Sequence, residues 1–284
     1  DGFIQQIGTP QEVFNPPSNL FVAGFIGTPQ MNFFDAKLIK NNGSLTVMDS
    51  KEGGKLTFVS TTPSANYGYS TSTIVNAGDL KIVSGTVEST TVGGASYAID
   101  NAWYTKDVSL TVEGGTVKAE KIAIRQVLFS TTAKNTVNIT GGTVESGYAG
   151  LQVHNFQTTA CLSEVNISGG TLSGTYAFYT SYSYNNTATG TDIEITGGTF
   201  NGYVYLYNGN AGSAEYPMTI SVTDGTFNGG YYAYCKDADS AEVAIPSVTG
   251  GIFAYDVSEY CAEGYGAQEN ADGSYGVHEH RYEA

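Results

Sequence analysis

A short phrase with one or two glycines recurs along this chain at nearly constant spacing, and it sets the architecture. The phrase reads GTV, GGTV, GGTV, GGTL, GGTF, DGTF and GGIF in turn, and the residue after the last glycine serves as a marker. The markers are Thr86, Thr116, Thr143, Thr171, Thr199, Thr226 and Ile252, so the steps between them are 30, 27, 28, 28, 27 and 26 residues. A period in this range indicates a repeat protein in which each unit packs on the next.

The repeat units have the pattern of short β-strands joined by tight turns. Residues 136–140 read TVNIT, alternating apolar and polar side chains, and the two glycines that follow allow the chain to turn. The same plan recurs at residues 164–170, 192–198 and 219–225. A unit of this length with three short strands matches one turn of a parallel β-helix. We therefore predict an all-β fold, a parallel β-helix of about seven coils over residues 51–277.

The alternation also predicts which side chains form the core. Stacking the units places one residue of each strand in an inward column, with a second column two residues further on. The first column is Val137, Val165, Ile193 and Ile220, and the second is Ile139, Ile167, Ile195 and Val222. In a repeat array such columns replace a single globular core.

The first 45 or so residues do not follow the repeat. A capping box at residues 9–12, with proline at the first helical position, predicts a helix that ends before Pro16. A second short helix is predicted over residues 18–25. We therefore divide the chain into a helical segment at residues 1–50, the β-helix, and a tail at residues 278–284.

The N-terminal segment carries a resemblance to a known family. Residues 1–38 read DGFIQQIGTPQEVFNPPSNLFVAGFIGTPQMNFFDAKL, which resembles a stretch of the ATP-binding subunits of carbohydrate-importing ABC transporters. In that family the stretch ends the nucleotide-binding domain and begins a small β-barrel regulatory domain. The motifs that bind and cleave ATP lie upstream of it in the family, and the GxxxxGK[ST] loop does not occur in this sequence. The resemblance therefore carries over no catalytic residue.

The repeats resemble a second group of proteins. They are similar to β-helical repeats of large extracellular proteins of gut Gram-positive bacteria, in which phrases such as ISGGTF recur. Residues 249–277 resemble the usual end of such arrays, and residues 278–284 resemble the opening of a following module. Two unrelated sequence styles thus meet near residues 45–55, which indicates a fused or mis-assembled reading frame.

Charge and hydropathy restrict the partners. The formal net charge is -15 with only two arginines, Arg125 and Arg281, whereas nucleic-acid-binding proteins gather Lys and Arg on one face. No run of about 18 apolar residues occurs, so no transmembrane segment is predicted. We expect no nucleic-acid partner, no cofactor and no metal.

An enzymatic site of the polysaccharide-lyase kind would need carboxylates and a basic side chain in one groove. Glu88 and Glu145 occupy the same place in their units, but Lys118 holds that place in the unit between them. Arg125 is the only arginine within the repeats, and His154 is the one histidine that could join it. These residues form no recognisable acid–base set, so we expect no catalytic residue here.

Tyrosines at matching positions of three successive units are the strongest candidate for a binding surface. They are Tyr176, Tyr179, Tyr203, Tyr205, Tyr207, Tyr232 and Tyr234. Alternate members should point outward and form an exposed aromatic strip on which a sugar ring or a partner protein could lie. The alternative is that stacked tyrosines stabilise the pairing of neighbouring strands.

Two cysteines and two histidines near the C-terminus each allow two interpretations. Cys235 and Cys261 lie nine residues after their markers, so they could occupy equivalent places one coil apart and form a disulfide. The alternative is a pair of buried thiols. His278 and His280 flank Glu279, but a metal site needs further ligands of fixed geometry, and the alternative is a frayed end.

The sequence leads to one main functional hypothesis and two alternatives, because a fold by itself does not fix an activity. The main hypothesis is a non-enzymatic, secreted or cell-surface repeat segment that acts as a rigid stalk or as an adhesive surface toward carbohydrate or a host protein. The first alternative is a fragment of a carbohydrate ABC transporter ATP-binding subunit at the cytoplasmic face of the membrane. The second is a polysaccharide lyase-like enzyme.

Overall fold

The computed structural model describes most of the chain after residue 70 and three short strands before it. The described residues are 36–41, 44–49, 57–60, 71–90, 96–101, 106–128, 130, 132–155, 162–182, 190–209, 218–237, 239 and 241–280. The helices predicted over residues 9–25 lie outside them, as does Cys161. By its packing the chain divides into Asp1–Ala36 and Lys37–Ala284, and the solenoid described below belongs to the second unit.

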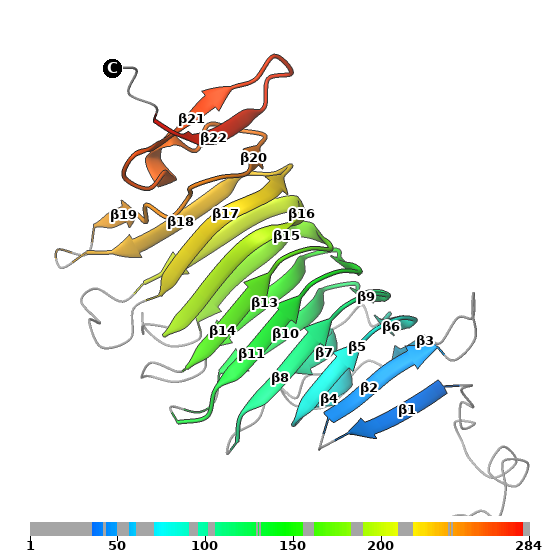
Figure 1. The fold of residues 1–284 in the computed structure, drawn as a ribbon. Helices are drawn as coiled ribbons and strands as arrows, with labels where there is room; N and C mark the ends of the chain where they lie inside the picture. The colour runs from blue at the N-terminus through cyan, green and yellow to red at the C-terminus, as the bar shows by residue number, and fades with distance from the viewer. Residues whose placement is uncertain are drawn as a thin grey trace, which may run out of the picture. The chain divides into compact units, whose positions relative to one another are not determined.

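The described residues form a parallel β-solenoid, as predicted, with three strands in each turn (Figure 1). The first face consists of β2 (Ser44–Asp49), β5 (Asp79–Ile82), β8 (Val108–Val112), β11 (Asn135–Ile139), β14 (Ser163–Ile167) and the beginnings of β16 (Thr191–Asn208) and β17 (Thr219–Phe227). The second face consists of β3 (Thr57–Ser60), β6 (Thr86–Ser89), β9 (Thr116–Ala119), β12 (Thr143–Ser146), the start of β15 (Thr171–Tyr182), the middle of β16, the end of β17, and β20 (Ile252–Phe253). The third face consists of β4 (Thr71–Asn76), β7 (Ser96–Asn101), β10 (Ile122–Leu128), β13 (Ala149–Asn155), the ends of β15 and β16, and β18 (Tyr231–Lys236).

The register of the second face confirms the stacking that the glycine phrase predicts. Each marker pairs with the marker of the next turn in a parallel ladder that runs Thr57, Thr86, Thr116, Thr143, Thr171, Thr199, Thr226 and Ile252. The two predicted core columns also pair in order on the first face. Their members are buried except Ile220, which is half-buried.

The predicted number of coils and the start of the solenoid both differ from the structure. Five turns, at residues 79–101, 108–128, 135–155, 163–182 and 191–208, have parallel neighbours on every face, against the predicted seven or so. The two remaining markers, Thr226 and Ile252, both lie at the C-terminal end, in turns that lack full parallel pairing. At the N-terminal end, β1 (Ala36–Asn41) pairs with β2, and β2 pairs in parallel with β5, so strands precede residue 51.

The glycine pairs are required because adjacent corners pack backbone on backbone. Gly142 has a φ of 75°, and a Cβ atom there would lie 2.8 Å from the carbonyl carbon of Gly114. A Cβ atom on Gly141 would lie 2.3 Å from the carbonyl oxygen of Glu113. Glycine therefore supplies both the left-handed backbone conformation and the close approach of successive turns.

Replacing Gly142 by alanine is expected to lower the free energy of unfolding by at least about 2 kcal/mol, through backbone strain and the displaced corner. Gly264 is the matched control, because its φ is 85° but nothing lies within 4 Å of an added Cβ. Gly264→Ala should cost about 1 kcal/mol from the φ angle alone. Urea denaturation of the two variants measures the difference, and equal losses would contradict the packing argument.

The third face is buried on both sides over two of its strands. Every residue of β7 and of β10 is buried, so their outward side chains are covered as well as their inward ones. On β15, β16 and β18 the outward side chains are instead partly exposed. The third face therefore changes along the stack from a covered, polar stretch to an open, aromatic one.

The last turn ends in a cap of antiparallel strands (Figure 1). β19 (Glu242–Ala244) pairs antiparallel with β18, and β22 (Tyr275–Glu279) pairs antiparallel with both β20 and β21 (Tyr265–Glu269). A single 3-10 turn, η1 (Ser258–Tyr260), precedes the hairpin. Helical structure in the described ranges is limited to this turn, and no helix there is long and apolar enough to cross a membrane.

The cap excludes a disulfide between Cys235 and Cys261, one of the two interpretations that their spacing allowed. Cys235 and Cys261 are both free thiols and are partly exposed. Cys235 lies on the third face and pairs with Val243, whereas Cys261 pairs with Val248, which continues the column of Val222 on the first face. The two cysteines are on different faces because β19 turns back antiparallel, so their equal spacing from the markers does not bring them into equivalent places.

Candidate functional site

The tyrosines predicted to form a strip lie together on the open part of the third face. Tyr179, Tyr205 and Tyr232 pair in one outward column, which continues that of Gln152. Tyr176 pairs with Tyr203 in a second column. We use the name tyrosine strip for Tyr148, Tyr176, Tyr179, Tyr203, Tyr205, Tyr207 and Tyr232.

The rings of the tyrosine strip contact one another at the spacing of neighbouring strands. The centroid of Tyr179 lies 4.8 Å from that of Tyr176 and 5.9 Å from that of Tyr205, with interplanar angles of 31° and 42°. The centroid of Tyr205 lies 6.3 Å from that of Tyr207 and 6.2 Å from that of Tyr232. The contacts of Tyr205 with Tyr179 and with Tyr232 join successive turns and stabilise the stack, whereas the other two lie within one strand.

The strip remains open to solvent at several rings. Tyr203 is 45% exposed, Tyr232 39% and Tyr148 41%, while Tyr207 is buried. Tyr148 was not among the predicted residues, since it precedes β13 and lies outside the repeated tyrosine positions, but it contacts Tyr176 edge-on at 5.4 Å between centroids. Exposed aromatic groups in a continuous row are typical of a binding surface.

A cavity of about 410 Å³ opens beside the strip. Its lining consists of Tyr179, Thr180, Tyr205, Tyr207 and Glu242. Glu242 comes from β19, and Thr180 is a buried residue of β15, so the sequence pattern pointed to neither. The cavity combines aromatic rings, hydroxyl groups and one carboxylate.

Tyr234 is the one predicted strip residue that the structure places in a different environment. Its hydroxyl donates a hydrogen bond to Oε1 of Glu259 at 3.1 Å, and its ring packs edge-on against Tyr260 with 5.5 Å between centroids. Tyr260 and Glu259 belong to η1 in the cap. Tyr234 therefore connects the last strand of the third face to the cap.

Arg125 is buried in an ion pair on the covered part of the third face. Its Nε donates to Oδ1 of Asp100 at 2.6 Å and its Nη2 donates to Oδ2 at 2.8 Å, a bidentate arrangement. The guanidinium carbon lies 3.7 Å from the ring centroid of Tyr97, and Nη1 donates to the Tyr97 hydroxyl. Arg125 is 8% exposed and Asp100 is 4% exposed. The guanidinium is therefore buried and bonded to side chains of the protein, so it is not available to a ligand. This arrangement does not offer the open basic groove that a lyase would need.

His154 of β13 lies within electrostatic reach of Arg125 and is half-buried. Burial, with a smaller contribution from the positive charge of Arg125, lowers the pKa of His154 to about 4. The imidazole is therefore neutral in the folded protein near neutral pH, whereas in the unfolded chain it titrates near 6.5.

This difference predicts a loss of stability at low pH. Above about pH 6.5 His154 is neutral in both states and costs nothing; as the pH falls from 6.5 toward 4, the unfolded chain takes up the proton first and stability falls. The loss at pH 4 is about 3 kcal/mol. His154→Gln, which cannot be protonated, should lose that much less between pH 7 and pH 4 in urea denaturation. An unchanged pH dependence in the variant would contradict the prediction.

Glu88, Lys118 and Glu145 pair in a single column on the second face, as their positions in the repeat suggest. Lys118 Nζ lies 3.0 Å from Oε1 of Glu88. The hydrogen bond and charge of Glu88 raise the pKa of Lys118, whose side chain is 37% exposed. Alternating charges neutralise each other here, so the column is a solvent-facing ion pair rather than a pair of catalytic carboxylates.

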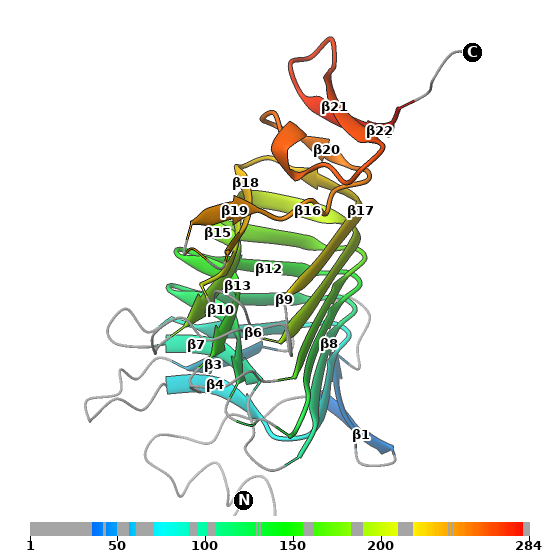
Figure 2. The ribbon, with the colours of Figure 1, turned by 90° about the vertical axis from the view of Figure 1, so that its left-hand side faces the viewer.

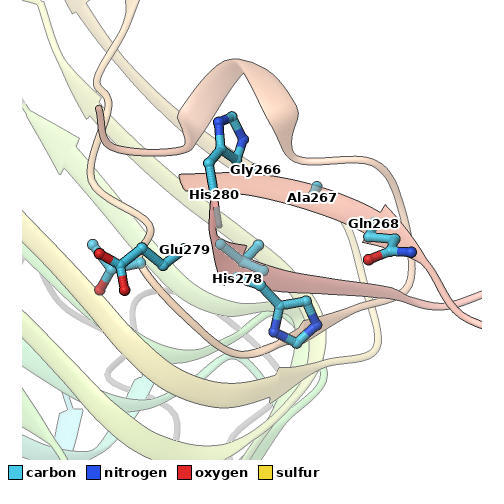
Figure 3. Close-up of a pocket in the computed structure, with 8 residues that line it drawn as sticks. Gly266, Ala267, Gln268, His278, Glu279 and His280 are labelled. Atoms are coloured by element: carbon cyan, nitrogen blue, oxygen red, sulfur yellow. The ribbon is translucent and has the colours of Figure 1, made fainter. Parts of the chain in front are cut away.

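The two histidines near the C-terminus do not form a metal pair. β22 extends to Glu279, so His278 lies in a strand and lines a cavity of about 800 Å³ with His280, Gln268 and Thr249. Figure 3 shows the imidazoles of His278 and His280 pointing away from each other. Among the described residues, no group of three or more His, Cys, Asp or Glu side chains is arranged to hold a metal ion.

Known proteins are similar to this chain over a short part of its length. It is 68% identical over 37 residues to the trehalose import ATP-binding protein SugC of Mycobacterium tuberculosis, covering 13% of this chain and 9% of that protein. It is 52% identical over 56 residues to the oligosaccharides import ATP-binding protein MsmX of Bacillus subtilis, covering 18% and 15%. It is 62% identical over 37 residues to the multiple sugar-binding transport ATP-binding protein MsmK of Streptococcus mutans, covering 13% and 10%.

These similarities support the resemblance noted at residues 1–38 to sugar-import ATP-binding subunits, and they are short. The chain spans 9 to 15% of the length of these relatives. No protein-family model matches the chain, and no solved structure matches it.

The comparisons contradict the main functional hypothesis drawn from the sequence. That hypothesis was a secreted or cell-surface stalk or adhesive segment, and it relied on the similarity of the repeats to extracellular arrays. The relatives found are ATP-binding subunits of sugar importers, which corresponds to the first alternative. The hypothesis failed because the repeat phrases are short and determine a fold more than a family.

Proposed function

We propose that this chain is part of an ATP-binding subunit of a carbohydrate importer and works at the cytoplasmic face of the membrane. The observation that carries the proposal is the 68% identity over 37 residues to the trehalose import ATP-binding protein of Mycobacterium tuberculosis. In the family that residues 1–38 resemble, this stretch ends the nucleotide-binding domain. The ATP-driven step itself would depend on motifs that the 284 residues do not include.

In the family that residues 1–38 resemble, a regulatory domain follows this stretch. The proposal places the solenoid there instead. Similarities of 13 to 18% of the chain leave most of the solenoid without a counterpart in these relatives. A rigid stack of turns placed directly after the N-terminal segment would then act as an accessory domain of the subunit. Because the sequence lacks the GxxxxGK[ST] loop, ATP binding by the isolated chain is not a suitable test.

A graft tests the proposal directly. Residues 1–38 of this chain replace the corresponding stretch of the Mycobacterium tuberculosis trehalose import ATP-binding protein, and ATP hydrolysis and trehalose import are measured in the assembled transporter. We expect both activities to be retained. The matched control replaces the same stretch with residues 79–116, a solenoid segment of equal length, and should be inactive. A graft that is folded but as inactive as this control would refute the proposal.

We also infer that the two segments were joined by fusion of separate reading frames between residues 36 and 55. The change of sequence style near residues 45–55 and the division of the chain after Ala36 both support this inference. Continuous DNA reads across the join are expected in an organism that makes the protein. Reads that always end at the join would identify it as an assembly artefact instead.

A further inference from the structure

We propose that the tyrosine strip and the cavity beside it bind a soluble, uncharged oligosaccharide. The cavity lies on the third face, where β15 and β16 run side by side. In Figure 2 the strands of this face, among them β7, β10 and β13, lie on the left. Its volume of about 410 Å³ is within the range of small-ligand sites, roughly 300–1,000 Å³. The inference rests on the proposed function in one respect: if the chain is part of an importer subunit, this site would make that subunit responsive to sugar.

The cavity has a fixed floor. The backbone N–H of Tyr207 donates to Oγ1 of Thr180 at 2.7 Å, and the same hydroxyl donates to the carbonyl oxygen of Tyr207 at 3.2 Å. Thr180 is 2% exposed, so these bonds are shielded from water. Tyr205 is held between Tyr179 and Tyr232 by ring contacts on both sides. A ligand would therefore meet side chains that are already in place, which lowers the entropic cost of binding.

The lining matches the two kinds of surface that a sugar ring presents. A pyranose has a face of C–H groups, which carry a slight positive charge, and a rim of hydroxyl groups. The face of a tyrosine ring carries the negative lobe of its quadrupole and suits the C–H face, while Tyr205 and Tyr207 also bring phenolic hydroxyls. The carboxylate of Glu242 accepts hydrogen bonds from sugar hydroxyls, and charge-assisted bonds are the stronger kind.

The charge of the site selects an uncharged ligand. The five lining residues include one carboxylate and no lysine or arginine. The chain as a whole has a formal net charge of -15. A sugar phosphate or a uronic acid would be repelled by Glu242 and by this field, whereas a neutral sugar would not.

The length of the strip favours an oligosaccharide over a single sugar. Beyond the cavity, Tyr232 and Tyr203 continue the row of rings, 6.0 Å apart between centroids and both well exposed. Tyr179, Tyr205 and Tyr232 lie on three successive turns of the solenoid, so an extended chain of sugar units could contact them in order. A protein partner would instead need a contact area of about 800 Å² on this chain, whereas this site is a small hollow lined by hydroxyl groups.

Titration calorimetry on the full 284-residue chain tests the proposal, with maltotetraose, cellotetraose, mannotetraose and trehalose as probes. We expect saturable binding of at least one tetrasaccharide in the millimolar range or tighter. Tyr205→Leu removes the ring face and hydroxyl and should weaken binding at least about tenfold. Glu242→Gln should weaken the binding severalfold. Because Glu242 is exposed, this substitution should leave the folding of the solenoid unchanged.

Tyr255→Leu is the matched control, because Tyr255 is a tyrosine of the cap that is 62% exposed and is not among the residues that line the cavity. It should leave the affinity unchanged. Absence of saturable binding of every probe would overturn the proposal, and so would binding that neither Tyr205→Leu nor Glu242→Gln weakens. The assay uses neither ATP nor a transporter, so a negative result here is distinct from failure of the graft.

Discussion

Replacing Arg125 by methionine is expected to lower the free energy of unfolding by about 3–5 kcal/mol. The substitution keeps an unbranched side chain, shorter by the guanidinium group, and leaves the carboxylate of Asp100 buried and without its bidentate donor. A hydroxyl of Ser72, which donates to Oδ2 of Asp100 at 2.6 Å, cannot replace a full positive charge. The cost is therefore that of an uncompensated buried charge rather than that of a lost contact. Guanidinium denaturation at pH 7 measures it.

Two controls separate this explanation from a general effect of mutation. Lys81→Met breaks the ion pair between Lys81 and Glu113, whose side chains are 39% and 40% exposed, and should cost less than about 1 kcal/mol. The double variant Asp100→Leu with Arg125→Met removes both charges and should recover a large part of the stability. If the double variant were less stable than Arg125→Met alone, the buried charge would not be the cause.

Replacing Phe227 by alanine is expected to cost about 3–5 kcal/mol. Phe227 is the middle ring of a stack with Phe200 and Phe253, with centroids 4.6 Å and 4.4 Å away and interplanar angles of 2° and 4°. All three side chains are at most 1% exposed. The truncation removes the ring contacts on both sides and leaves a cavity between turns that the β-strands prevent from closing. The loss is measured by denaturation.

The location of the stack adds a specific expectation. Phe253 belongs to β20, which pairs with β17 and with β22 of the cap, so Phe227→Ala should weaken the attachment of the cap. Hydrogen exchange at β21 and β22 should then quicken more than exchange at β8 and β11, because a stack of repeats loses stability nearest the damaged turn. Ile252→Ala is the control, because Ile252 directly precedes Phe253 but is 48% exposed. It should lower the free energy of unfolding by less than about 1 kcal/mol. Equal losses for the two variants would contradict the role of the stack.

The regular middle of the solenoid could be predicted residue by residue. Thr143 pairs with Thr116 and with Thr171, as equal spacing from the glycine corners requires, and the same spacing places Val165 between Val137 and Ile193. The prediction succeeded because the corners cannot shift: each glycine pair packs directly on the pair of the preceding turn. A one-residue slip would also reverse the buried face of every strand.

The candidate site could be predicted only in part. The matching positions of the tyrosines in successive units predicted the two columns that contain Tyr205 and Tyr203, because those columns follow the repeat. Glu242 was not predictable, since it reaches the cavity only because β19 reverses direction, and no periodic signal marks that reversal. Tyr234 was assigned to the strip by phase, but contacts with η1 draw it toward the cap.

The sequence by itself determined the parallel stack, its register and its inward columns, because these depend on short-range patterns that repeat in every unit. The tertiary structure alone decided which polar groups are buried together. Asp100 meets Arg125 across one turn, and Asn101 donates to Oε1 of Gln126 at 3.1 Å while it accepts from Nδ2 of Asn76 at 2.7 Å. Asn76, Asn101 and Gln126 follow one another in one column, but no alternation in the sequence marks this column as buried. Their hydrogen bonds are therefore fixed only when the turns are stacked and water is excluded from the third face.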